Sequence, residues 1–391
     1  MKLSLRTALT AAAVVLAMAA GTAGERPQTV AFVPAAATAT SLKILDWNIQ
    51  GGTGTDGRYD FGRIIDVIAA ENPDIVTLQE LHDNSSVGGD NQWQLLVNRF
   101  PAYKAHFAKG DTNAFGGVAG NLILSKYDII EKLTYQLPQY PADSAAVLRS
   151  LGGVKINVNG TDVRIYTTHL SPGLGAEATE RRNRQARAAI DKVSNASLMP
   201  TPMLLTGDLN VRPDNEIRPW FAQAGWYDAW TQVNANIGAD VITHPGDGDD
   251  ARIDYVYATP GFDVSAAHTV ATIASDHYPV VANVTTRATA ATKAKAVLAG
   301  AASQEGWADL AVYADSSSKL RVCDNEADGW GVRAYVRARS GGSVVVIGND
   351  GAYADRCGTF TTGSGTVSSP TVRVCLYKGG EEKDCRETTV T

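Results

Sequence analysis

Through most of the first three quarters of the chain, short apolar runs alternate with stretches that carry apolar residues at helical spacing. The runs have strand length, are rich in β-branched residues and are bounded by Gly, Asn, Asp or Pro. They read LKILDWNI, DIVTLQE, GNLILS, VKINVNG, VRIYTTHL, MLLTGDLN, RIDYVYA and YPVVANV. Helical spacing predicts helices over residues 61–70, which Pro73 ends, and over residues 177–195. The mixture predicts one layered α/β domain over residues 41–286.

The pattern changes after this domain. Residues 287–303, RATAATKAKAVLAGAAS, are rich in alanine and predict a linker, part of which could be helical. Short alternating segments separated by Gly and Ser clusters follow over residues 304–391. They predict a small C-terminal all-β domain of the sandwich type.

The four cysteines, Cys323, Cys357, Cys375 and Cys385, all lie in this last domain. In an oxidising compartment they should pair, and four cysteines allow three connectivities. Cys375 and Cys385 flank Lys378-Gly379-Gly380, which suits a hairpin turn, so we favour pairing 375 with 385 and 323 with 357. A structural zinc site is the alternative, although the spacing contains no close C-x-x-C pair.

The N-terminus carries two basic residues, a short apolar run and the small residues Gly21-Thr22-Ala23. This order predicts a cleaved signal peptide over residues 1–23, followed by a flexible leader over residues 24–40. A buried N-terminal helix is the alternative. The apolar run is too short to cross a bilayer, and no later stretch is long and apolar enough. We therefore expect a secreted, extracellular protein without an integral membrane segment. We also expect a monomer.

The charge balance bears on the kind of partner. Removal of residues 1–23 takes away two positive charges and no acid, which lowers the net charge from −6 to −8. Proteins that hold nucleic acid through a basic surface need many phosphate contacts, and this balance argues against that class. An enzyme that recruits phosphate through a bound metal needs no such excess.

Polar residues lie at or near the ends of many of the predicted strands. Strand ends carry side chains to the rim of a sheet, where loops form clefts, so we expect these residues to share one site. They are Asn48, Glu80, His169, Asp208, Asn210, Asp254, Asp276 and His277. Carboxylates and amides suit Mg²⁺, Mn²⁺ or Ca²⁺, and histidines exchange protons near neutral pH. Each residue alone also fits a helix cap, a turn or a buried histidine, so the hypothesis depends on their order and combination.

That order resembles the endonuclease/exonuclease/phosphatase superfamily, which includes pancreatic-type deoxyribonucleases, repair endonucleases, inositol phosphatases and bacterial sphingomyelinases. The matching segments are LDWNIQGG, DIVTLQEL, GNLILSKYDI, TTHLS, LLTGDLNVRP, RIDYVYA and SDHYPV. The resemblance implies an α/β fold, a four-layer αββα sandwich with two mixed β-sheets and the site at one edge.

The resemblance also implies a metal site. Glu80 would hold the principal divalent cation, most simply Mg²⁺, with Asn48 close by and Asp276 completing or approaching the ligand set. Arg149 falls where relatives often carry a basic residue that faces the substrate, although a surface salt bridge explains it equally well.

The remaining roles concern water and phosphate. By the same resemblance, Asp208 and Asn210 would orient the attacking water, with Asp208 able to act as general base. His169 and His277 would bind the scissile phosphate and assist proton transfer. Asp254 would hydrogen-bond His277 and favour its cationic form.

The substrate is the least determined part of this interpretation. Metal-assisted in-line attack of water on a phosphodiester is the expected reaction, with nucleic acid as the favoured substrate. A sphingomyelinase-like phospholipid phosphodiesterase or another phosphatase is the alternative, because loops around a shared centre decide the substrate. A non-enzymatic binding module is disfavoured, since every residue of the inferred centre is present.

Overall fold

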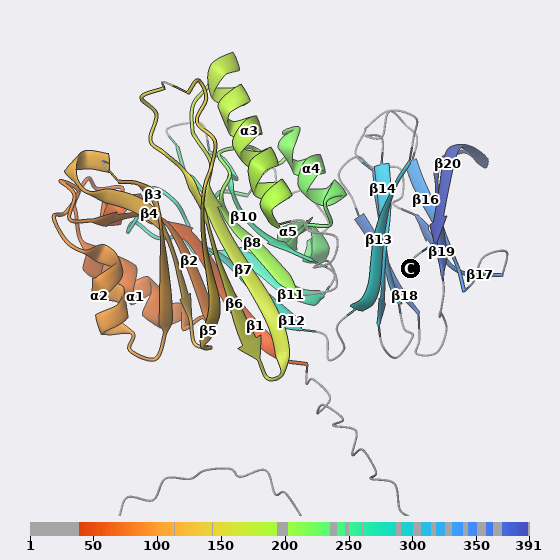
Figure 1. Ribbon diagram of the computed structural model, residues 1–391, viewed down its shortest axis with the longest axis horizontal. Helices are drawn as coiled ribbons and strands as arrows, with labels where there is room; N and C mark the ends of the chain where they lie inside the picture. Colours follow the sequence, from red (N-terminus) through yellow and green to blue (C-terminus); the bar gives the residue numbers. More distant parts are fainter. Residues whose placement is uncertain are drawn as a thin grey trace, which may run out of the picture. The chain divides into compact units, whose positions relative to one another are not determined.

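The structure is a computed structural model that describes part of the chain (Figure 1). The described residues are 39–112, 114–142, 144–193, 202–234, 241–246, 250–259, 261–286, 291–299, 306–313, 318–324, 331–338, 343–349, 357–362 and 370–389. The predicted signal peptide and most of the predicted leader therefore lie outside the described residues.

The N-terminal domain contains two six-stranded mixed sheets. Sheet I has the order β11 (Phe262–Thr269), β12 (Val280–Thr286), β1 (Ser41–Asn48), β2 (Ile75–Asp83), β4 (Val118–Ser125) and β3 (Lys104–Asp111). Sheet II has the order β5 (Ile129–Gln136), β6 (Ser150–Val158), β7 (Thr161–His169), β8 (Met203–Asp208), β10 (Asp254–Ala258) and β9 (Tyr227–Asp228). The pairs β1–β2 and β7–β8 are parallel, and the other pairs are antiparallel.

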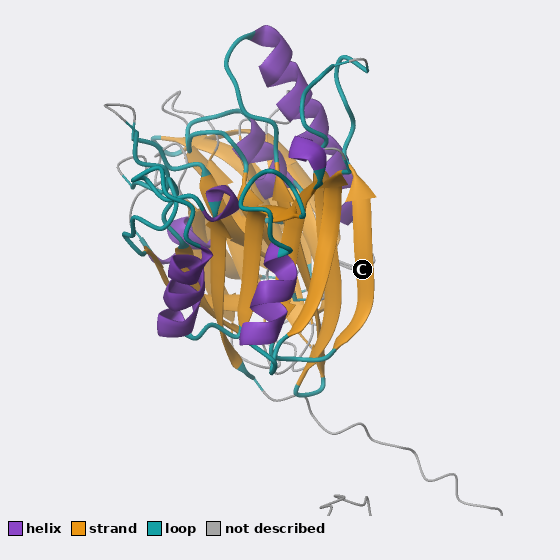
Figure 2. Ribbon diagram, turned by 90° about the vertical axis from the view of Figure 1, so that its left-hand side faces the viewer, coloured by secondary structure: helices purple, strands orange, loops and turns teal. Residues whose placement is uncertain are grey.

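Helices cover the outer face of each sheet, which gives the four layers that the resemblance implied (Figure 1). The helices are α1 (Phe61–Glu71), α2 (Gln92–Arg99), α3 (Ala176–Val193), α4 (Ile217–Gln223) and α5 (Ala229–Val233), with 3₁₀ turns η1 (Gln50–Gly52) and η2 (Ala114–Gly116). Apolar residues of α1 and α2 pack on sheet I, and those of α3 and α4 pack on sheet II. Figure 2 shows helices lying over the strands on the side of sheet I. None of the described helices is long and apolar enough to span a membrane.

The helix predictions are confirmed to within a few residues. Helix α1 starts after Asp60, whose side chain accepts a hydrogen bond from the Gly62 amide, and it ends at Asn72 in a left-handed conformation just before Pro73. Helix α3 covers Ala176–Val193, and the last two residues of the predicted helix, 194 and 195, lie outside the described residues.

The strands that lead to the site carry apolar side chains along most of their length and polar side chains at one end. On the face of β1 that meets sheet II, Leu42 and Ile44 belong to the apolar layer between the sheets. Asp46 and Asn48 continue the same face, because side chains two residues apart point the same way. The layer between the sheets is therefore apolar at one end and polar at the other, and the polar end carries the site.

Gly207 allows β8 to approach β7 closely just before Asp208. Its φ is +138°, and a Cβ at this position would overlap the carbonyl oxygen of Thr168 on β7. We expect Gly207→Ala to destabilise the fold by roughly 2–4 kcal/mol, because both the backbone and its neighbour must move. Gly89→Ala is the matched control, since Gly89 also has a positive φ, +74°, but nothing lies within 4 Å of its added Cβ. Urea unfolding would measure the free energy of unfolding of both variants. Equal stability of Gly207→Ala and Gly89→Ala would contradict the close approach as a requirement for glycine.

The C-terminal domain is all-β, as predicted, and contains two four-stranded sheets. One has the order β13 (Ala291–Ala299), β14 (Gly306–Tyr313), β15 (Ser318–Asp324) and β18 (Cys357–Thr362). The other has the order β17 (Val344–Asn349), β16 (Gly331–Arg337), β19 (Thr371–Lys378) and β20 (Glu381–Thr389). Buried aliphatic residues of β14 and β15 pack against those of β16 and β19, which makes the domain a sandwich.

The prediction of a linker over residues 287–303 is wrong for Ala291–Ala299. These residues form β13, which pairs with β14 in antiparallel register. Alanine and lysine have weak strand propensity, so the sequence of the segment does not indicate a strand. Pairing with the neighbouring strand supplies the backbone hydrogen bonds that override this propensity.

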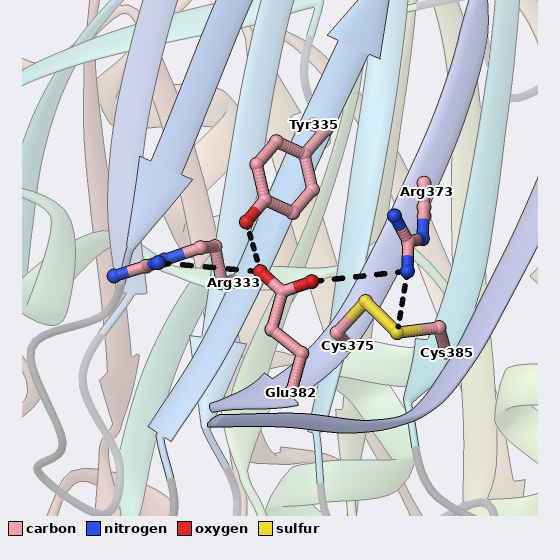
Figure 3. Close-up of a disulfide and its surroundings, with 6 residues drawn as sticks. All are labelled: Arg333, Tyr335, Arg373, Cys375, Glu382 and Cys385. Atoms are coloured by element: carbon pink, nitrogen blue, oxygen red, sulfur yellow. Dashed lines mark hydrogen bonds and ion pairs between the residues drawn. A yellow bond between two sulfur atoms is a disulfide. The ribbon is translucent and has the colours of Figure 1, made fainter. Parts of the chain in front are cut away.

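Cys375 and Cys385 form the predicted disulfide between β19 and β20, with an S–S distance of 2.07 Å. Figure 3 shows Glu382 beside it, accepting a hydrogen bond from Tyr335 and forming an ion pair with Arg373 at 3.7 Å. The same arginine donates a hydrogen bond to the Cys385 sulfur at 3.2 Å.

For Cys323 and Cys357 the structure gives the position of the backbone only. The register of β15 and β18 places Cys323 opposite Cys357. The side chains of these two cysteines lie outside the described part of the chain, so their pairing stays a prediction.

Candidate active site

The predicted site residues come together at one edge of the two sheets. Asn48 ends β1, and His169 and Asp208 end the parallel strands β7 and β8, where they are register partners. Asp254 begins the antiparallel neighbour β10 opposite Asp208. Strand ends from both sheets thus bring side chains far apart in the sequence to a common rim.

Glu80 reaches this rim through a β-bulge. Leu78 and Leu81 of β2, three residues apart, pair with residues of β4 that are only two apart, so β2 contains one extra residue here. Glu80 lies in this bulge and has a φ of +57°. The bulge places Glu80 at the end of the layer between the sheets, with its side chain 35% exposed. Its Oε1 accepts a hydrogen bond from Asn48 Nδ2 at 3.2 Å.

Asn48 joins Glu80 to Asp208. Its buried side-chain nitrogen also donates to Asp208 Oδ2 at 3.1 Å, while its Oδ1 accepts from the backbone amide of Gln50 at 3.1 Å. The amide orientation is therefore fixed by the backbone on one side and by two carboxylates on the other.

Asp208 is the most connected carboxylate of the site. Its Oδ1 accepts from the Asn210 amide at 2.8 Å, and its Oδ2 lies 3.4 Å from His169 Nε2 and 3.8 Å from His277 Nε2. Burial and then the charge of Asp254 raise the pKa of Asp208 to about 7. Asn210 has a φ of +53° and donates from its side chain to the Leu170 carbonyl at 3.0 Å.

His277 and Asp254 form a buried pair. The Nδ1 atom of His277 lies 2.8 Å from Asp254 Oδ2, which fixes Nδ1 as the donor and turns Nε2 toward the site. Burial opposes the charge on His277, but Asp254, Asp208 and Asp276 outweigh it and raise the pKa of His277 to about 10. These carboxylates therefore favour the cationic form of the imidazole.

His169 has the opposite character. Arg149 Nη1 lies 2.8 Å from its Nδ1, and because arginine only donates, Nδ1 accepts and the ring proton sits on Nε2. Burial, then the charges of Arg149 and His277, hold the pKa of His169 well below its usual value. The structure thus brings Arg149 to the site, where it contacts a histidine directly.

A pocket of about 120 Å³ opens beside this arginine. Glu80, Arg149 and His169 line it on the side of the site. Phe115, which is 58% exposed, and Asn121 also line it. The pocket therefore combines charged groups with an aromatic ring beside Glu80.

Asp276 approaches two histidines. Its Oδ1 lies 4.0 Å from His277 Nε2, and its Oδ2 lies 3.9 Å from Nε2 of His244. It shares the rim with Glu80, and its expected place in the ligand set of Glu80 stays a prediction.

His244 is a site residue that the sequence analysis missed. Its ring packs edge to face on His277, with centroids 4.6 Å apart. It belongs to the sequence THPGDGD, which lies at no predicted strand end and in no quoted motif. An aromatic nitrogen base in a polar loop before RIDYVYA was the one available signal.

A buried polar network lies directly beneath the site. Asp46 Oδ1 accepts from Thr77 Oγ1 and Gln79 Nε2, both at 2.8 Å, on sheet I. Gln79 also reaches Thr167 at 2.9 Å, and Thr206 donates to Thr77 at 2.8 Å, so the network crosses between the sheets. Burial, then the charge of a neighbouring aspartate, raises the pKa of Asp46 to about 8. Each member precedes a site residue by one to three positions, so these cross-sheet bonds set how the two halves of the site face each other.

Comparisons with known proteins match the chain to one family. The model of the "Endonuclease/Exonuclease/phosphatase family" matches residues 47–277, which is more than half of the chain. The chain belongs to this family. Members of the family hydrolyse phosphoesters. A second model, "Endonuclease/exonuclease/phosphatase family, ig-like domain", matches residues 290–382 and thus covers β13, the strand that the sequence pattern had assigned to a linker.

Individual family members extend the comparison. A solved endonuclease/exonuclease/phosphatase structure from Beutenbergia cavernae is 30% identical, with a TM-score of 0.76 over 89% of this chain and 99% of that one. An exodeoxyribonuclease of Streptococcus pneumoniae is 26% identical over 182 residues, 45% of this chain and 64% of that protein. Human tyrosyl-DNA phosphodiesterase 2 is 23% identical over 220 residues, 50% of this chain and 53% of that protein. The chain thus spans less than two thirds of either curated relative.

The donor set at Glu80 fits the divalent cation that this family implies. Glu80 and Asp208 both lie within hydrogen-bond distance of one Asn48 nitrogen, so two carboxylates gather around a single neutral donor. Only Oε1 of Glu80 is hydrogen-bonded to a described residue, and the side chain is open to solvent. Oxygen donors with a free, accessible carboxylate are what Mg²⁺, Mn²⁺ and Ca²⁺ bind.

Proposed function

We propose that this chain is an exported, divalent-metal-dependent phosphodiesterase whose substrate is nucleic acid. One observation carries the proposal. Glu80 and Asp208 share the amide of Asn48, and the cationic His277, held by Asp254, faces the same Asp208. A carboxylate able to hold a metal and an imidazolium at the same site together suit an anionic phosphorus centre.

Glu80, with Asn48 beside it, would hold the cation, most simply Mg²⁺. When bound there, the cation supplies charge neutralisation for a phosphate oxygen and for the leaving oxygen.

The chain's own residues account for water and proton. Asp208 accepts a proton from the attacking water, because a carboxyl with a pKa of about 7 can act as a base near neutral pH. Asn210 holds Asp208 through its backbone amide and keeps the loop in place. His277 donates from Nε2 to a phosphate oxygen, and neutral His169 donates from its own Nε2.

Two considerations support nucleic acid as the substrate. The exodeoxyribonuclease and the tyrosyl-DNA phosphodiesterase among the relatives act, by their names, on DNA. The pocket beside Arg149 also combines a cation with the exposed ring of Phe115, and aromatic rings stack on bases.

Metal removal tests the reaction. With a chromogenic phosphodiester such as bis(p-nitrophenyl) phosphate, we expect hydrolysis in Mg²⁺ that EDTA abolishes and added Mg²⁺ restores. Hydrolysis that ignores chelation would remove the metal from the proposal. Parallel assays on plasmid DNA, RNA and sphingomyelin vesicles test the substrate, and faster turnover of the lipid would favour the sphingomyelinase-like alternative.

Export has a separate test. N-terminal sequencing of the chain recovered from culture medium should show that residues 1–23 have been removed. An intact N-terminus on a chain retained inside the cell would contradict export while leaving the chemistry untouched.

A further inference from the structure

His244 contributes an imidazole to the rim that none of the roles proposed above uses. Its ring packs edge to face on His277, and Asp276 approaches both rings. Oδ2 of Asp276 is 3.9 Å from His244 Nε2, and Oδ1 is 4.0 Å from His277 Nε2. One donor atom from each of the three residues lies within 4.8 Å of the other two.

We propose that His244, Asp276 and His277 form a second cation site, separate from Glu80, that takes zinc-type ions and blocks hydrolysis when filled. Two imidazole nitrogens and one carboxylate oxygen suit Zn²⁺, Co²⁺ or Ni²⁺. Mg²⁺ prefers oxygen donors and keeps its waters, so it belongs at Glu80. The two sites therefore differ in donor chemistry.

The spacing of the donors is close to what one ion requires. Two ligands at about 2.1 Å from a tetrahedral ion lie about 3.4 Å apart. The separations of 3.9 and 4.0 Å reach different oxygens of Asp276 and need to close by about 0.5 Å, and the other separations, which are at most 4.8 Å, need to close by up to about 1.4 Å. The side chains of His244 and Asp276 are 35% and 31% exposed, which leaves them room to rotate. The same exposure lets an ion enter from solvent.

The backbone holds the three donors in place before any ion arrives. His244 exchanges two backbone hydrogen bonds with Ala251, at 2.9 and 3.0 Å. Ser275 Oγ accepts from the His277 amide at 3.1 Å and donates to the Asn48 carbonyl at 2.8 Å, which fixes the turn that carries Asp276. Donors on a preorganised backbone lose little conformational entropy when they bind.

Asp254 supports the proposed site through its hydrogen bond with His277. It occupies Nδ1 of His277 and leaves Nε2 directed at the cluster. A carboxylate bonded to the far nitrogen of a metal-bound histidine is the usual support of zinc sites. An ion on Nε2 displaces the proton that His277 donates in the proposed reaction, so a filled site cannot stabilise the phosphate.

Titration of the full chain, free of any affinity tag, with Co²⁺ tests the site without substrate, because nitrogen-bound Co²⁺ absorbs visible light. We expect one such Co²⁺ per chain, displaced by Zn²⁺ and not by excess Mg²⁺. His244→Phe keeps an aromatic ring against His277 but removes its nitrogens, and it should weaken Co²⁺ binding about tenfold or more. Asp276→Asn should weaken it similarly, and it decides the matter if His244→Phe does not fold.

Two controls sharpen the titration. His268→Phe removes an exposed histidine from β11 and should leave Co²⁺ affinity unchanged. Glu80→Gln should also leave it unchanged, because Glu80 is not a member of the cluster. Unchanged Co²⁺ affinity in His244→Phe and Asp276→Asn would overturn the proposal. An equal loss in Glu80→Gln would overturn it too, since the ion would then belong to the Glu80 site.

The blocking effect rests on the proposed function and has its own readout. Zn²⁺ should inhibit Mg²⁺-dependent hydrolysis, and the concentration for half-inhibition should rise about tenfold in His244→Phe, relative to the zinc-free rate of each protein. The same half-inhibiting concentration in both proteins would refute the blocking role. If no phosphoester is hydrolysed, the proposed function fails, whereas the Co²⁺ titration still decides whether the cation site exists.

Discussion

Glu80→Gln should lower Mg²⁺-dependent hydrolysis by roughly a hundred- to a thousandfold. The change removes the charge that holds the cation but keeps an oxygen that can accept from Asn48, whose nitrogen now lies 3.2 Å from Oε1. Loss of one such charge-stabilising contribution costs about 2.7–4 kcal/mol in the transition state. Rates measured over a range of Mg²⁺ concentrations should show both a lower maximum and a higher half-saturating concentration.

Stability separates loss of the metal from loss of the fold in this variant. Glu80 is 35% exposed, so its conversion to Gln should change the free energy of unfolding by no more than about 0.5 kcal/mol. Glu71→Gln is the matched control, because Glu71 pairs with Lys43 at 2.6 Å on α1, away from the site. That variant should keep full activity. Normal hydrolysis by Glu80→Gln would show that the cation is held elsewhere.

The strands could be predicted because their inward faces are apolar for most of their length. Ile44 and Leu204 mark the layer between the sheets, and the polar residues that end this face, Asn48 and Asp208, stood out against the apolar run before them. The four-layer arrangement did not follow from those patterns. It came from the resemblance, since strand order depends on contacts far apart in the sequence.

The parts that escaped prediction share one cause. Asp46 stands between Leu45 and Trp47, and such alternation is typical of a polar residue that faces solvent. In the structure it is fully buried, because the opposite face of β1 packs under helices and its own face meets a second sheet. His244 escaped for a related reason, since its position depends on bonds with Ala251 in a loop and on no periodic pattern.

His277→Ala should lower the maximal rate by about a hundred- to ten-thousandfold, because the variant lacks both the proton donor and its positive charge. Asp254→Asn should also slow the reaction, since an amide neither raises the pKa of the histidine nor fixes Nδ1 as the donor. The double variant should be no slower than His277→Ala alone, because the two residues act as one unit.

The free energy of unfolding should change in a different way, with the double variant more stable than His277→Ala alone. His277→Ala leaves the carboxylate of Asp254, which is 0% exposed, without its partner and should cost about 1–3 kcal/mol, part of which Asp254→Asn returns in the double variant. Additive losses in rate, together with a double variant less stable than His277→Ala, would mean that the pair is not coupled and that the imidazole acts without its aspartate.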